Sequence, residues 1–297
     1  MANNIDIAMC ADKNHVAGLH VTLYSLMHYL DVQYSVRFHF FLDKYSAKDL
    51  DDIKETLRDF DDRYSYKIYK ISEFDLGKGK GLHGNKLSRL TFYGPQVINS
   101  QRLLFLDVDL LILMSVHELF TEDLMGSVAG AVSMKTVKYA NELAFLNELG
   151  ISSDTRYFNA GIMVFDCELW KGQDLTRKCL DFMDMHYSRF HSADQTVLNV
   201  VLNNNMKFLG KKYNMHCYPD VALTQETGLG NICHFVGSPK PWDLFGEYLH
   251  KGYPLFKEYL RKTSYSRYKS YENLSYMKLK RAFLLSKQYL KIIKNTA

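Results

Sequence analysis

The chain has 297 residues, a formal net charge of +4 and 47% hydrophobic residues, which is enough apolar surface for a large buried core. The start of the chain is polar and no apolar run approaches the roughly 20 residues of a membrane helix, so we expect neither a signal peptide nor a membrane span but a cytoplasmic globular protein. The five scattered cysteines form no Cys-x-x-Cys pair, which argues against a disulfide framework or a zinc knuckle and favours reduced core cysteines.

The charge is unevenly distributed along the chain. From Lys257 to the end, eleven Lys and Arg stand against two Glu, which gives this segment +9 and leaves −5 for residues 1–256. Gly246, Gly252 and Pro254 interrupt the sequence just before it. We therefore expect a main domain at residues 1–250 and a basic, aromatic, helical C-terminal extension at residues 251–297.

Strand and helix patterns alternate before the extension, as in an α/β fold with a mixed, mostly parallel sheet flanked by helices. Short apolar runs predict strands at residues 5–11, 35–42, 66–71, 102–106, 128–134 and 158–165. Helical spacing predicts helices at residues 16–30, 47–60, 87–98 and 173–187, the third interrupted by Gly94-Pro95. A nucleotide-binding sheet fits this order, although neither common glycine-rich phosphate motif is present.

The most informative segment is Phe105-Leu-Asp-Val-Asp-Leu-Leu-Ile112, where two carboxylates fall inside an apolar run. Buried carboxylates this close repel each other unless a cation lies between them. Asp107 and Asp109 directly follow the predicted strand, at the sheet edge where α/β proteins bind ligands. A solvated turn is the ordinary interpretation of an isolated Asp-x-Asp, but this context predicts a divalent cation with a phosphate ester. A haloacid-dehalogenase phosphatase would carry Thr or Val at position 111, so Leu111 argues against that class.

Six blocks of the sequence, taken together, resemble glycosyltransferase family 8, which includes retaining lipooligosaccharide galactosyltransferases and glycogenin. In chain order the blocks are ADKN at 11–14, LSRL at 87–90, FLDVDLLI at 105–112, YFNAGIMVFD at 157–166, SADQTVLN at 192–199 and HFVGSPKPW at 234–242. They keep the family's order and approximate spacing over residues 5 to 245. The resemblance implies a GT-A fold in the main domain, a UDP-sugar donor, a bound Mn²⁺ and transfer with retention of anomeric configuration, and no nucleic-acid partner.

The resemblance also implies a metal site made by Asp107, Asp109 and His234. Two carboxylates and an imidazole suit Mn²⁺ better than Mg²⁺, which stays an alternative. A lone histidine is often structural, but His234 ends a predicted strand that leads into a Gly-Ser-Pro-Lys turn. In that turn Gly237 would let the backbone approach the donor phosphates and Lys240 would balance their charge; an ordinary turn is the alternative.

Further residues match positions at which the family holds its donor. Asp12 and Asn14 correspond to contacts with uracil and ribose, and His15 to a ring stacked on the base, although helix capping would also explain the first two. Arg89 matches a residue that reaches the phosphate and sugar, unless it is a surface charge. Asn159 interrupts an apolar strand and needs hydrogen-bond partners if buried. The donor contacts implied by the resemblance are Ala11, Asp12, Asn14, His15, Arg89, Asp107, Val108, Asn159, Gly237 and Lys240.

The catalytic candidates are Asp194 and Gln195. In the family the matching acid binds hydroxyls of the donor sugar and the matching amide lies near the anomeric carbon. The alternative is a capping box, because Ser192 and Gln195 have the S-x-x-Q spacing. A double displacement needs a carboxylate nucleophile and glutamine is a poor one. We therefore favour substitution on one face of the sugar, with the leaving UDP oxygen helping to deprotonate the acceptor and Gln195 stabilising the oxocarbenium-like state.

The sequence departs from the family's pattern at the acceptor position. Where galactosyltransferases of the family carry an acceptor-contacting Asp, this chain has Ser133-Met134-Lys135. We expect UDP-galactose or UDP-glucose as donor and a bacterial cell-surface glycan or glycolipid, such as lipopolysaccharide core, as acceptor. A metal-dependent nucleotidyltransferase or hydrolase would leave His234, Gly237 and Lys240 unexplained. A non-catalytic, lectin-like or scaffold protein is the third alternative.

Apolar and basic residues alternate at helical spacing in the C-terminal extension. The apolar positions are Tyr276, Leu279, Phe283, Leu290 and Ile293. The basic positions are Lys278, Lys280, Arg281, Lys287, Lys291 and Lys294. A basic amphipathic helix predicts attachment to an anionic membrane, which would hold the enzyme peripherally on the inner face of the plasma membrane. A helix packed on its own domain with a solvated basic face is the alternative.

Overall fold

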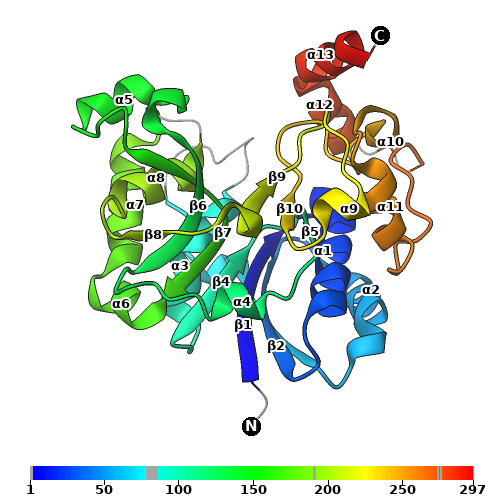
Figure 1. Cartoon of the computed structure of the whole chain (residues 1–297), viewed down its shortest axis with the longest axis horizontal. Helices are drawn as coiled ribbons and strands as arrows, with labels where there is room; N and C mark the ends of the chain where they lie inside the picture. The colour runs from blue at the N-terminus through cyan, green and yellow to red at the C-terminus, as the bar shows by residue number, and fades with distance from the viewer. Residues whose placement is uncertain (1–2, 78–85, 190–191, 273, 275, 297) are drawn as a thin grey trace.

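The computed structural model describes residues 3–77, 86–189, 192–272, 274 and 276–296. Its main element is a seven-stranded sheet that lies between two layers of helices (Figure 1). The strand order is β3 (Tyr64–Tyr69), β2 (Tyr34–Leu42), β1 (Asn3–Ala11), β4 (Arg102–Leu106), β7 (Arg156–Asp166), β6 (Ala129–Thr136) and β8 (Met206–Phe208). The first four strands are parallel, whereas β7 runs antiparallel to both β4 and β6. The expected mixed α/β sheet is confirmed.

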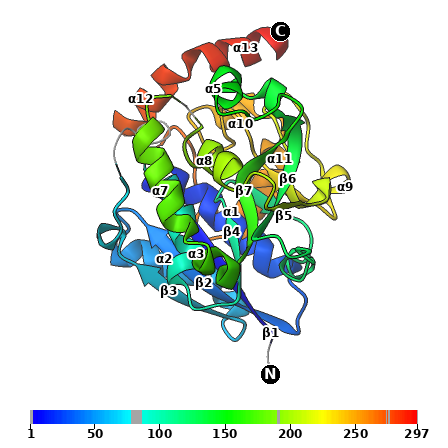
Figure 2. The same ribbon diagram turned by 90° about the vertical axis from the view of Figure 1, so that its left-hand side faces the viewer.

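The two helix layers explain why the central strands are continuous apolar runs. On one side lie α1 (Val16–Tyr29) and α2 (Ala47–Leu57). On the other are α3 (Leu90–Val97), α6 (Cys167–Gly172), α7 (Leu175–His186) and α8 (Ala193–Val201), of which α3 and α7 are seen in front in Figure 2. In β4, Leu104 and Leu106 pack toward α1 while Leu103 and Phe105 pack toward α3 and α8. A strand buried on both faces has no polar alternation.

A second, three-stranded sheet carries the continuation of the Asp-x-Asp segment. Its order is β5 (Leu110–Ile112), β10 (Ile232–His234) and β9 (Met215–His216). The chain passes directly from β4 through the two acids into β5. The small sheet therefore brings the predicted strand before His234 against the acidic segment, since His234 pairs with Leu110.

The predicted elements differ from the structure mainly in α3. We expected Gly94-Pro95 to interrupt this helix, but α3 runs through both residues to Val97, and that expectation is wrong. Pro95 stands close to the end of the helix, where its missing N–H removes a single helical hydrogen bond. Gly94 allows a close approach to β4, because an added Cβ would lie 3.1 Å from the ring of Phe105. Burial against the strand thus compensates for the poor helix propensity.

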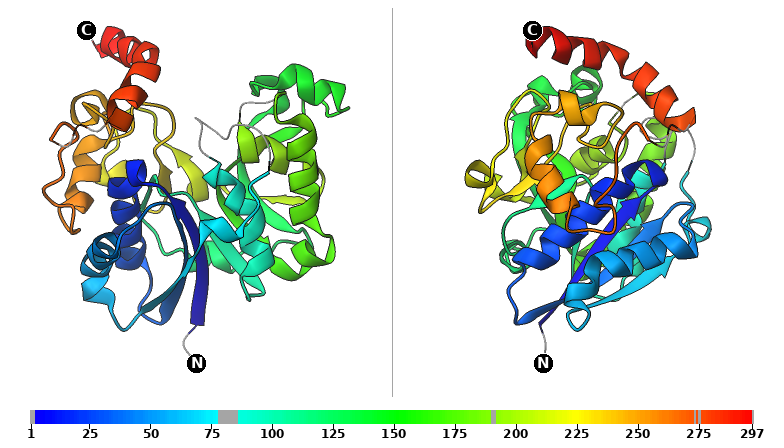
Figure 3. Two further views of the ribbon diagram at one scale, coloured as in Figure 1. Left: turned by 180° about the vertical axis from the view of Figure 1, so that it is seen from behind. Right: turned by 90° about the vertical axis from the view of Figure 1, so that its right-hand side faces the viewer.

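The C-terminal extension begins inside the main core and ends at the surface. Helix α10 (Gly246–Leu249) precedes α11 (Tyr253–Leu260), whose Leu255, Phe256 and Leu260 are buried with Ala17 and Trp242. Helices α12 (Tyr276–Leu284) and α13 (Ser286–Thr296) then lie at the periphery, at the end of the molecule opposite the N-terminus (Figures 1 and 3). None of the described helices has the length and apolarity that crossing a bilayer requires. The division after residue 250 stays a prediction.

The remaining helices are short and lie in the connections: α4 (His117–Phe120), α5 (Leu143–Glu148) and α9 (Gln225–Gly228). The five cysteines are free, and four of them are buried.

Candidate active site

Asp107 and Asp109 occupy the turn between β4 and β5, at the carboxyl end of the central parallel strands. The backbone fixes this turn, because the Asp107 N–H donates to the carbonyl of Gly161 at 2.7 Å and the Phe235 N–H donates to the carbonyl of Asp109 at 3.0 Å. Thr22 of α1 holds the next residue, with its hydroxyl bonded to both main-chain groups of Leu110. The two acids are therefore presented at the sheet edge predicted from the sequence.

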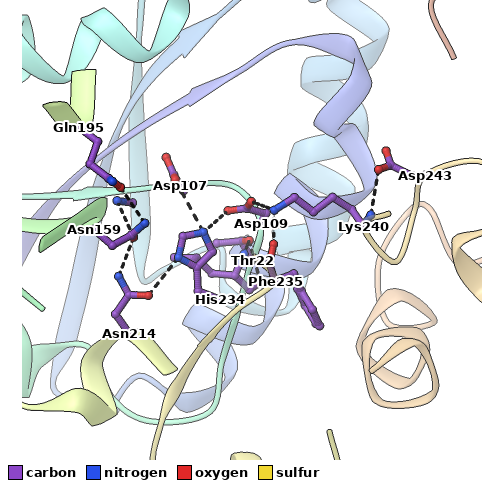
Figure 4. A network of polar contacts seen from close by, with 12 residues as sticks. Thr22, Asp107, Asp109, Asn159, Gln195, Asn214, His234, Phe235, Lys240 and Asp243 are labelled. Atoms are coloured by element: carbon purple, nitrogen blue, oxygen red, sulfur yellow. Dashed lines mark hydrogen bonds and ion pairs between the residues drawn. The ribbon is translucent and has the colours of Figure 1, made fainter. Parts of the chain in front are cut away.

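The three predicted metal ligands converge in the structure. One side-chain ligand atom from each of Asp107, Asp109 and His234 lies within 4.8 Å of the other two. His234 Nε2 is 3.1 Å from Asp109 Oδ1 and 3.9 Å from Asp107 Oδ2 (Figure 4). His234 is buried, whereas Asp107 remains half exposed. The arrangement provides two carboxylate oxygens and one imidazole nitrogen around a single point that solvent can reach.

The two carboxylates perturb each other's protonation. Burial and the charge of Asp109 raise the pKa of Asp107 to about 6, a shift that solvent partly screens because half of that side chain is exposed. Burial also acts to raise the pKa of Asp109, but Lys240 and His234 outweigh it and hold that pKa well below its usual range. One acid therefore resists ionisation beside the other. A divalent cation would remove this repulsion.

A partly buried chain of amides fixes which nitrogen of His234 faces the acids. Asn159 Nδ2 donates to Gln195 Oε1 at 3.1 Å, and Asn214 Nδ2 donates to Asn159 Oδ1 at 2.9 Å. The carbonyl oxygen of Asn214 then accepts from His234 Nδ1 at 3.0 Å (Figure 4). With its proton on Nδ1, the imidazole directs the Nε2 lone pair at the acids, the arrangement that metal-binding histidines adopt. Asp107, Asp109 and His234 thus fit a divalent cation.

Lys240 supplies positive charge beside this point. Its ammonium group donates to Asp109 Oδ2 at 2.7 Å and to the carbonyl of Phe235. The turn that delivers it depends on Gly237, whose φ of +78° is a left-handed conformation that residues with a side chain rarely adopt. Lys240 thus lies at the acidic pair, whereas the approach of the Gly237 backbone to donor phosphates stays a prediction.

The residues after β1 make a compact polar turn next to the acids. Asp12 caps the short 3-10 helix η1 (Lys13–His15), since its carboxylate accepts from the Asn14 N–H at 2.9 Å and lies 2.8 Å from His15 Nδ1. Burial opposes ionisation of Asp12, but His15 and Asn14 together hold its pKa at about 2. Asp12 therefore caps η1, whereas α1 itself begins at His15 without a side-chain cap, and Asp12 is left as an ionised acceptor beside the site.

Val108 brings the Asp-x-Asp turn against the helix that follows η1. An added Cβ on Gly18 of α1 would lie 2.5 Å from the carbonyl oxygen of Val108 and 2.7 Å from the ring of Trp242. Only glycine allows this approach. Ala11 is buried at the end of β1, so the predicted nucleoside contacts and the predicted metal ligands share one edge of the sheet.

Asp194 and Gln195 open α8 on the other side of Asp107. Burial and the charge of Asp107 raise the pKa of Asp194 to about 7, despite contacts of its carboxylate with backbone N–H groups at the start of the helix. The capping-box alternative is wrong, because the Ser192 side chain makes no capping hydrogen bond. The carbonyl of Gln195 is instead engaged by Asn159 and, at 3.4 Å, by the Ala160 N–H.

Arg89 is not a surface charge. It is only 1% exposed, and burial lowers its pKa against the opposing effect of Asp184 and Asp194. Its guanidinium donates to the carbonyl of Leu76. A buried cation near Asp194 is consistent with the predicted donor contact and excludes the alternative.

Sequence reasoning missed two residues that shape the site. Asn214, which is fully buried, orients His234, and Thr22 pins the turn after Asp109. Neither lies in a recognisable motif. Their signal, a polar residue that folding buries completely, is visible only once the tertiary structure is known.

The fold and the site define a glycosyltransferase of the GT-A type, in which an Asp-x-Asp turn closes the central strands of a mixed sheet. The chain belongs to glycosyltransferase family 8, whose family model matches residues 6–245. The resemblance seen in the sequence is thereby confirmed.

Known proteins similar to the chain agree with this assignment. It is 24% identical to general stress protein A of Bacillus subtilis over 287 residues, covering 90% of this chain and 96% of the relative. It is 24% identical to lipopolysaccharide 1,3-galactosyltransferase of Salmonella typhimurium over 265 residues, 83% and 75% of the two chains. Among solved structures, galactosyltransferase LgtC in complex with donor and acceptor sugar analogs superimposes with a TM-score of 0.72 at 18% identity, covering 92% and 98%.

Proposed function

We propose that the protein is a metal-dependent, retaining glycosyltransferase that moves a hexose from UDP-galactose or UDP-glucose to a glycan or glycolipid in bacterial cell-surface polysaccharide synthesis. The observation that carries the proposal is the convergence of Asp107, Asp109 and the Nε2 atom of His234 beside Lys240. A metal site with a lysine ammonium group beside it suits a diphosphate leaving group. The similarity to lipopolysaccharide galactosyl- and glucosyltransferases supports the donor and the pathway.

The metal ligands would be Asp107, Asp109 and His234, and the mixed oxygen and nitrogen donor set favours Mn²⁺ over Mg²⁺. When bound, the ion supplies Lewis-acid stabilisation of the departing diphosphate. Lys240 would exchange its contact with Asp109 for one with a phosphate oxygen, and Gly237 would let the main chain approach the same group.

The nucleoside would bind along Ala11, Asp12, Asn14, His15 and Val108. The ionised carboxylate of Asp12 offers an acceptor for N–H or hydroxyl groups, and the His15 ring would lie against the base. The position of these residues at the same sheet edge as Asp107 supports this assignment.

The sugar would lie among Arg89, Asn159 and Asp194, with Gln195 at the anomeric carbon. The Gln195 side-chain carbonyl accepts hydrogen bonds from Asn159 Nδ2 and from the Ala160 N–H. These two bonds hold the amide in one orientation before the UDP-sugar binds. A neutral amide favours substitution on one face: the C–O bond to UDP breaks, the acceptor oxygen attacks from the same side, and its proton passes to the leaving phosphate oxygen.

The acceptor would differ from that of galactosyltransferases that carry an acidic residue where this chain has Ser133-Met134-Lys135, at the end of β6. Ser133 donates to the carbonyls of Lys135 and Tyr157, and Lys135 lies over the Tyr157 ring at 5.3 Å. The position thus presents a cation in place of the carboxylate.

We further propose that α12 and α13 attach the protein to an anionic lipid surface. Large apolar side chains stay exposed on these helices, among them Phe283 at 79% and Leu284 at 63%, together with Leu279, Leu290 and Ile293. Lys280, Lys287, Lys291 and Lys294 are exposed beside them. Apolar groups interleaved with lysines suit a bilayer interface. The side chain of Tyr276 lies outside the described residues.

The opposite face of the same helices packs on the protein. Leu285 and Ile292 are buried, Arg281 pairs with Asp243, and Lys278 donates to the carbonyl of Ser270. Two of the six basic residues expected to face the membrane therefore point inward, and a packed helix and a membrane surface can coexist.

The function is tested by incubating the purified chain with UDP-galactose, UDP-glucose and UDP-N-acetylglucosamine, with and without Mn²⁺. We expect release of UDP from UDP-galactose or UDP-glucose. The release should depend on Mn²⁺ and should be faster when lipopolysaccharide-core acceptors are present. Release of hexose 1-phosphate instead of UDP would indicate transfer or hydrolysis at the uridylyl group, as in a nucleotidyltransferase or hydrolase, and UDP binding without turnover would indicate a non-catalytic protein.

A further inference from the structure

The segment from Gly237 to Gly246, which we call the donor loop, carries Lys240 and is folded tightly on itself. The Gly246 N–H donates to the carbonyl of Asp243 at 2.7 Å, and an added Cβ on Gly246 would lie 2.3 Å from the carbonyl oxygen of Lys240. The loop therefore behaves as one packed unit whose position decides where the Lys240 ammonium lies.

The C-terminal extension holds this loop from outside. The hydroxyl of Tyr268 donates to the carbonyl of Trp242 at 2.9 Å, and the Phe245 N–H donates to the Ser270 hydroxyl at 3.0 Å. Farther along the extension, Arg281 and Tyr289 line a small cavity of about 10 Å³ together with Asn14 and Trp242. The extension thus reaches both the donor loop and a predicted nucleoside contact.

The strongest of these contacts is an ion pair between Arg281 and Asp243. Arg281 Nε donates to Asp243 Oδ1 at 2.9 Å and Nη2 donates to Oδ2 at 3.2 Å, the two-pronged geometry in which arginine binds carboxylates. The Asp243 side chain is 5% exposed and that of Arg281 24%. Burial makes the carboxylate dependent on its partner, because an unpaired buried charge is costly.

Asp243 passes this constraint to Lys240. Its Oδ2 atom also accepts from the Lys240 N–H at 2.8 Å, while the other end of Lys240 reaches Asp109 at 2.7 Å (Figure 4). A continuous series of polar contacts therefore runs from α12 through Asp243 and Lys240 to a candidate metal ligand. Each link is a direct hydrogen bond.

We propose that Arg281 is a positioning residue for the donor diphosphate, acting through Asp243 on Lys240. The proposal deepens the proposed function and rests on it. Without the guanidinium, Asp243 turns toward solvent, the Lys240 N–H loses its acceptor, and the Lys240 ammonium spends less time beside the phosphates. Lys240 binds the diphosphate both in the ground state and in the transition state, so the donor KM rises while kcat changes little. Residues that orient a direct ligand typically change affinity by about 10-fold or more.

The experiment compares Arg281→Gln with Arg267→Gln, which removes the same group from an exposed position of the extension. We expect the donor KM and the Kd of UDP with Mn²⁺, measured by titration calorimetry, to rise about 10-fold in Arg281→Gln and to stay unchanged in Arg267→Gln. Arg281→Lys keeps the charge but not the two-pronged contact and should recover part of the affinity. A folded Arg281→Gln protein with unchanged KM and Kd would overturn the proposal.

A double variant guards against a folding defect in the single one. Asp243→Asn with Arg281→Gln removes both charges of the pair together, which proteins tolerate better than removal of one. Because the two residues act in series, the double variant should show the KM of Asp243→Asn alone to within about twofold. A wild-type KM in the double variant, or a KM higher than that of Asp243→Asn alone, would show that Arg281 does not act through Asp243.

The proposal can fail separately from the proposed function. Hydrogen exchange at the Lys240 amide can be measured without a UDP-sugar. We expect Arg281→Gln to accelerate this exchange, whereas Arg267→Gln should not. An unmodified chain that turns over no UDP-sugar would refute the proposed function. Active wild-type protein with an unchanged Lys240 amide in Arg281→Gln would refute the role of Arg281 alone.

Discussion

Gln195 and His234, from opposite sides of the site, are connected by two amides in series: Asn159 bonds to Gln195, and Asn214 bonds to both Asn159 and His234. One proton arrangement satisfies the whole series, with N–H groups directed toward Gln195 and the imidazole proton on Nδ1. The residue proposed to act at the anomeric carbon and the residue proposed to bind the metal are thus oriented by the same hydrogen-bond network.

Asn214→Leu tests this network at its centre. Leucine fills a similar volume but cannot accept the His234 proton, so the imidazole loses its preferred tautomer. We expect Mn²⁺ affinity, followed by the spin-resonance signal of free Mn²⁺, to fall about 10- to 100-fold. Asn141→Leu, at an exposed position, serves as the control. Equal Mn²⁺ affinity of the two variants would remove Asn214 from the metal site.

Replacement of either acid of the Asp-x-Asp turn should abolish activity, but the two replacements should change the stability of the protein by different amounts. Asp107→Ala and Asp109→Ala should both lose Mn²⁺-dependent turnover, because each removes several kcal/mol of charge stabilisation. Asp107 is half exposed, so its loss should leave stability nearly unchanged. Asp109→Ala leaves Lys240, 12% exposed, without its carboxylate, and we expect about 3 kcal/mol of destabilisation. Urea titrations measure the difference, and full activity in either variant contradicts the metal assignment.

How far the sequence predicts this protein can be judged from particular residues. Continuous apolar runs predict the strands that are buried on both faces, such as β4. The two acids that interrupt one of these runs indicate the position of the site. The antiparallel direction of β7 and the partner of His234 depend on contacts between distant segments, which no local pattern records. The same limit applies to Arg281: its spacing places it on the basic side of a helix, but only the folded chain shows that it meets Asp243.

Gln195→Ala distinguishes a catalytic role from a structural one. Since Ser192 does not cap α8, loss of the Gln195 side chain removes no cap, but it leaves Asn159 Nδ2 and the Ala160 N–H without their acceptor, so we expect stability to fall by about 1 kcal/mol. The rate in single-turnover experiments should fall by at least about 10-fold, with a smaller change in donor KM, because the amide acts mainly on the transition state. A product of inverted configuration in the nuclear magnetic resonance spectrum would refute same-face substitution.

Asp194 should make the metal-free protein less stable above about pH 7 than at about pH 4. Its folded pKa of about 7 lies above the value of about 3.9 for an unfolded aspartate, so the folded state favours the protonated form. Stability from this group is therefore lost as pH rises from about 4 to about 7, and the loss is complete above that range. Asp194→Asn mimics the protonated acid and should be more stable than the wild type by roughly 1 to 4 kcal/mol at pH 8, although inactive. An equal gain at pH 4.5 and pH 8 in urea titrations would show that ionisation is not the cause.

The exposed apolar residues of the terminal helices can be tested without disturbing the contact that Arg281 makes. Phe283→Ser with Leu290→Ser removes two large groups that are 79% and 57% exposed, so the fold should be unaffected. We expect the wild type to sediment with vesicles containing anionic lipid, less so as salt rises, and not with neutral vesicles. The double variant should bind the anionic vesicles at least about 10-fold more weakly, because burial of two large side chains contributes several kcal/mol.

Met125→Ser with Met185→Ser, which replaces two exposed apolar residues elsewhere on the protein, is the matched control. Equal vesicle binding by both double variants would exclude α12 and α13 as the lipid-binding surface.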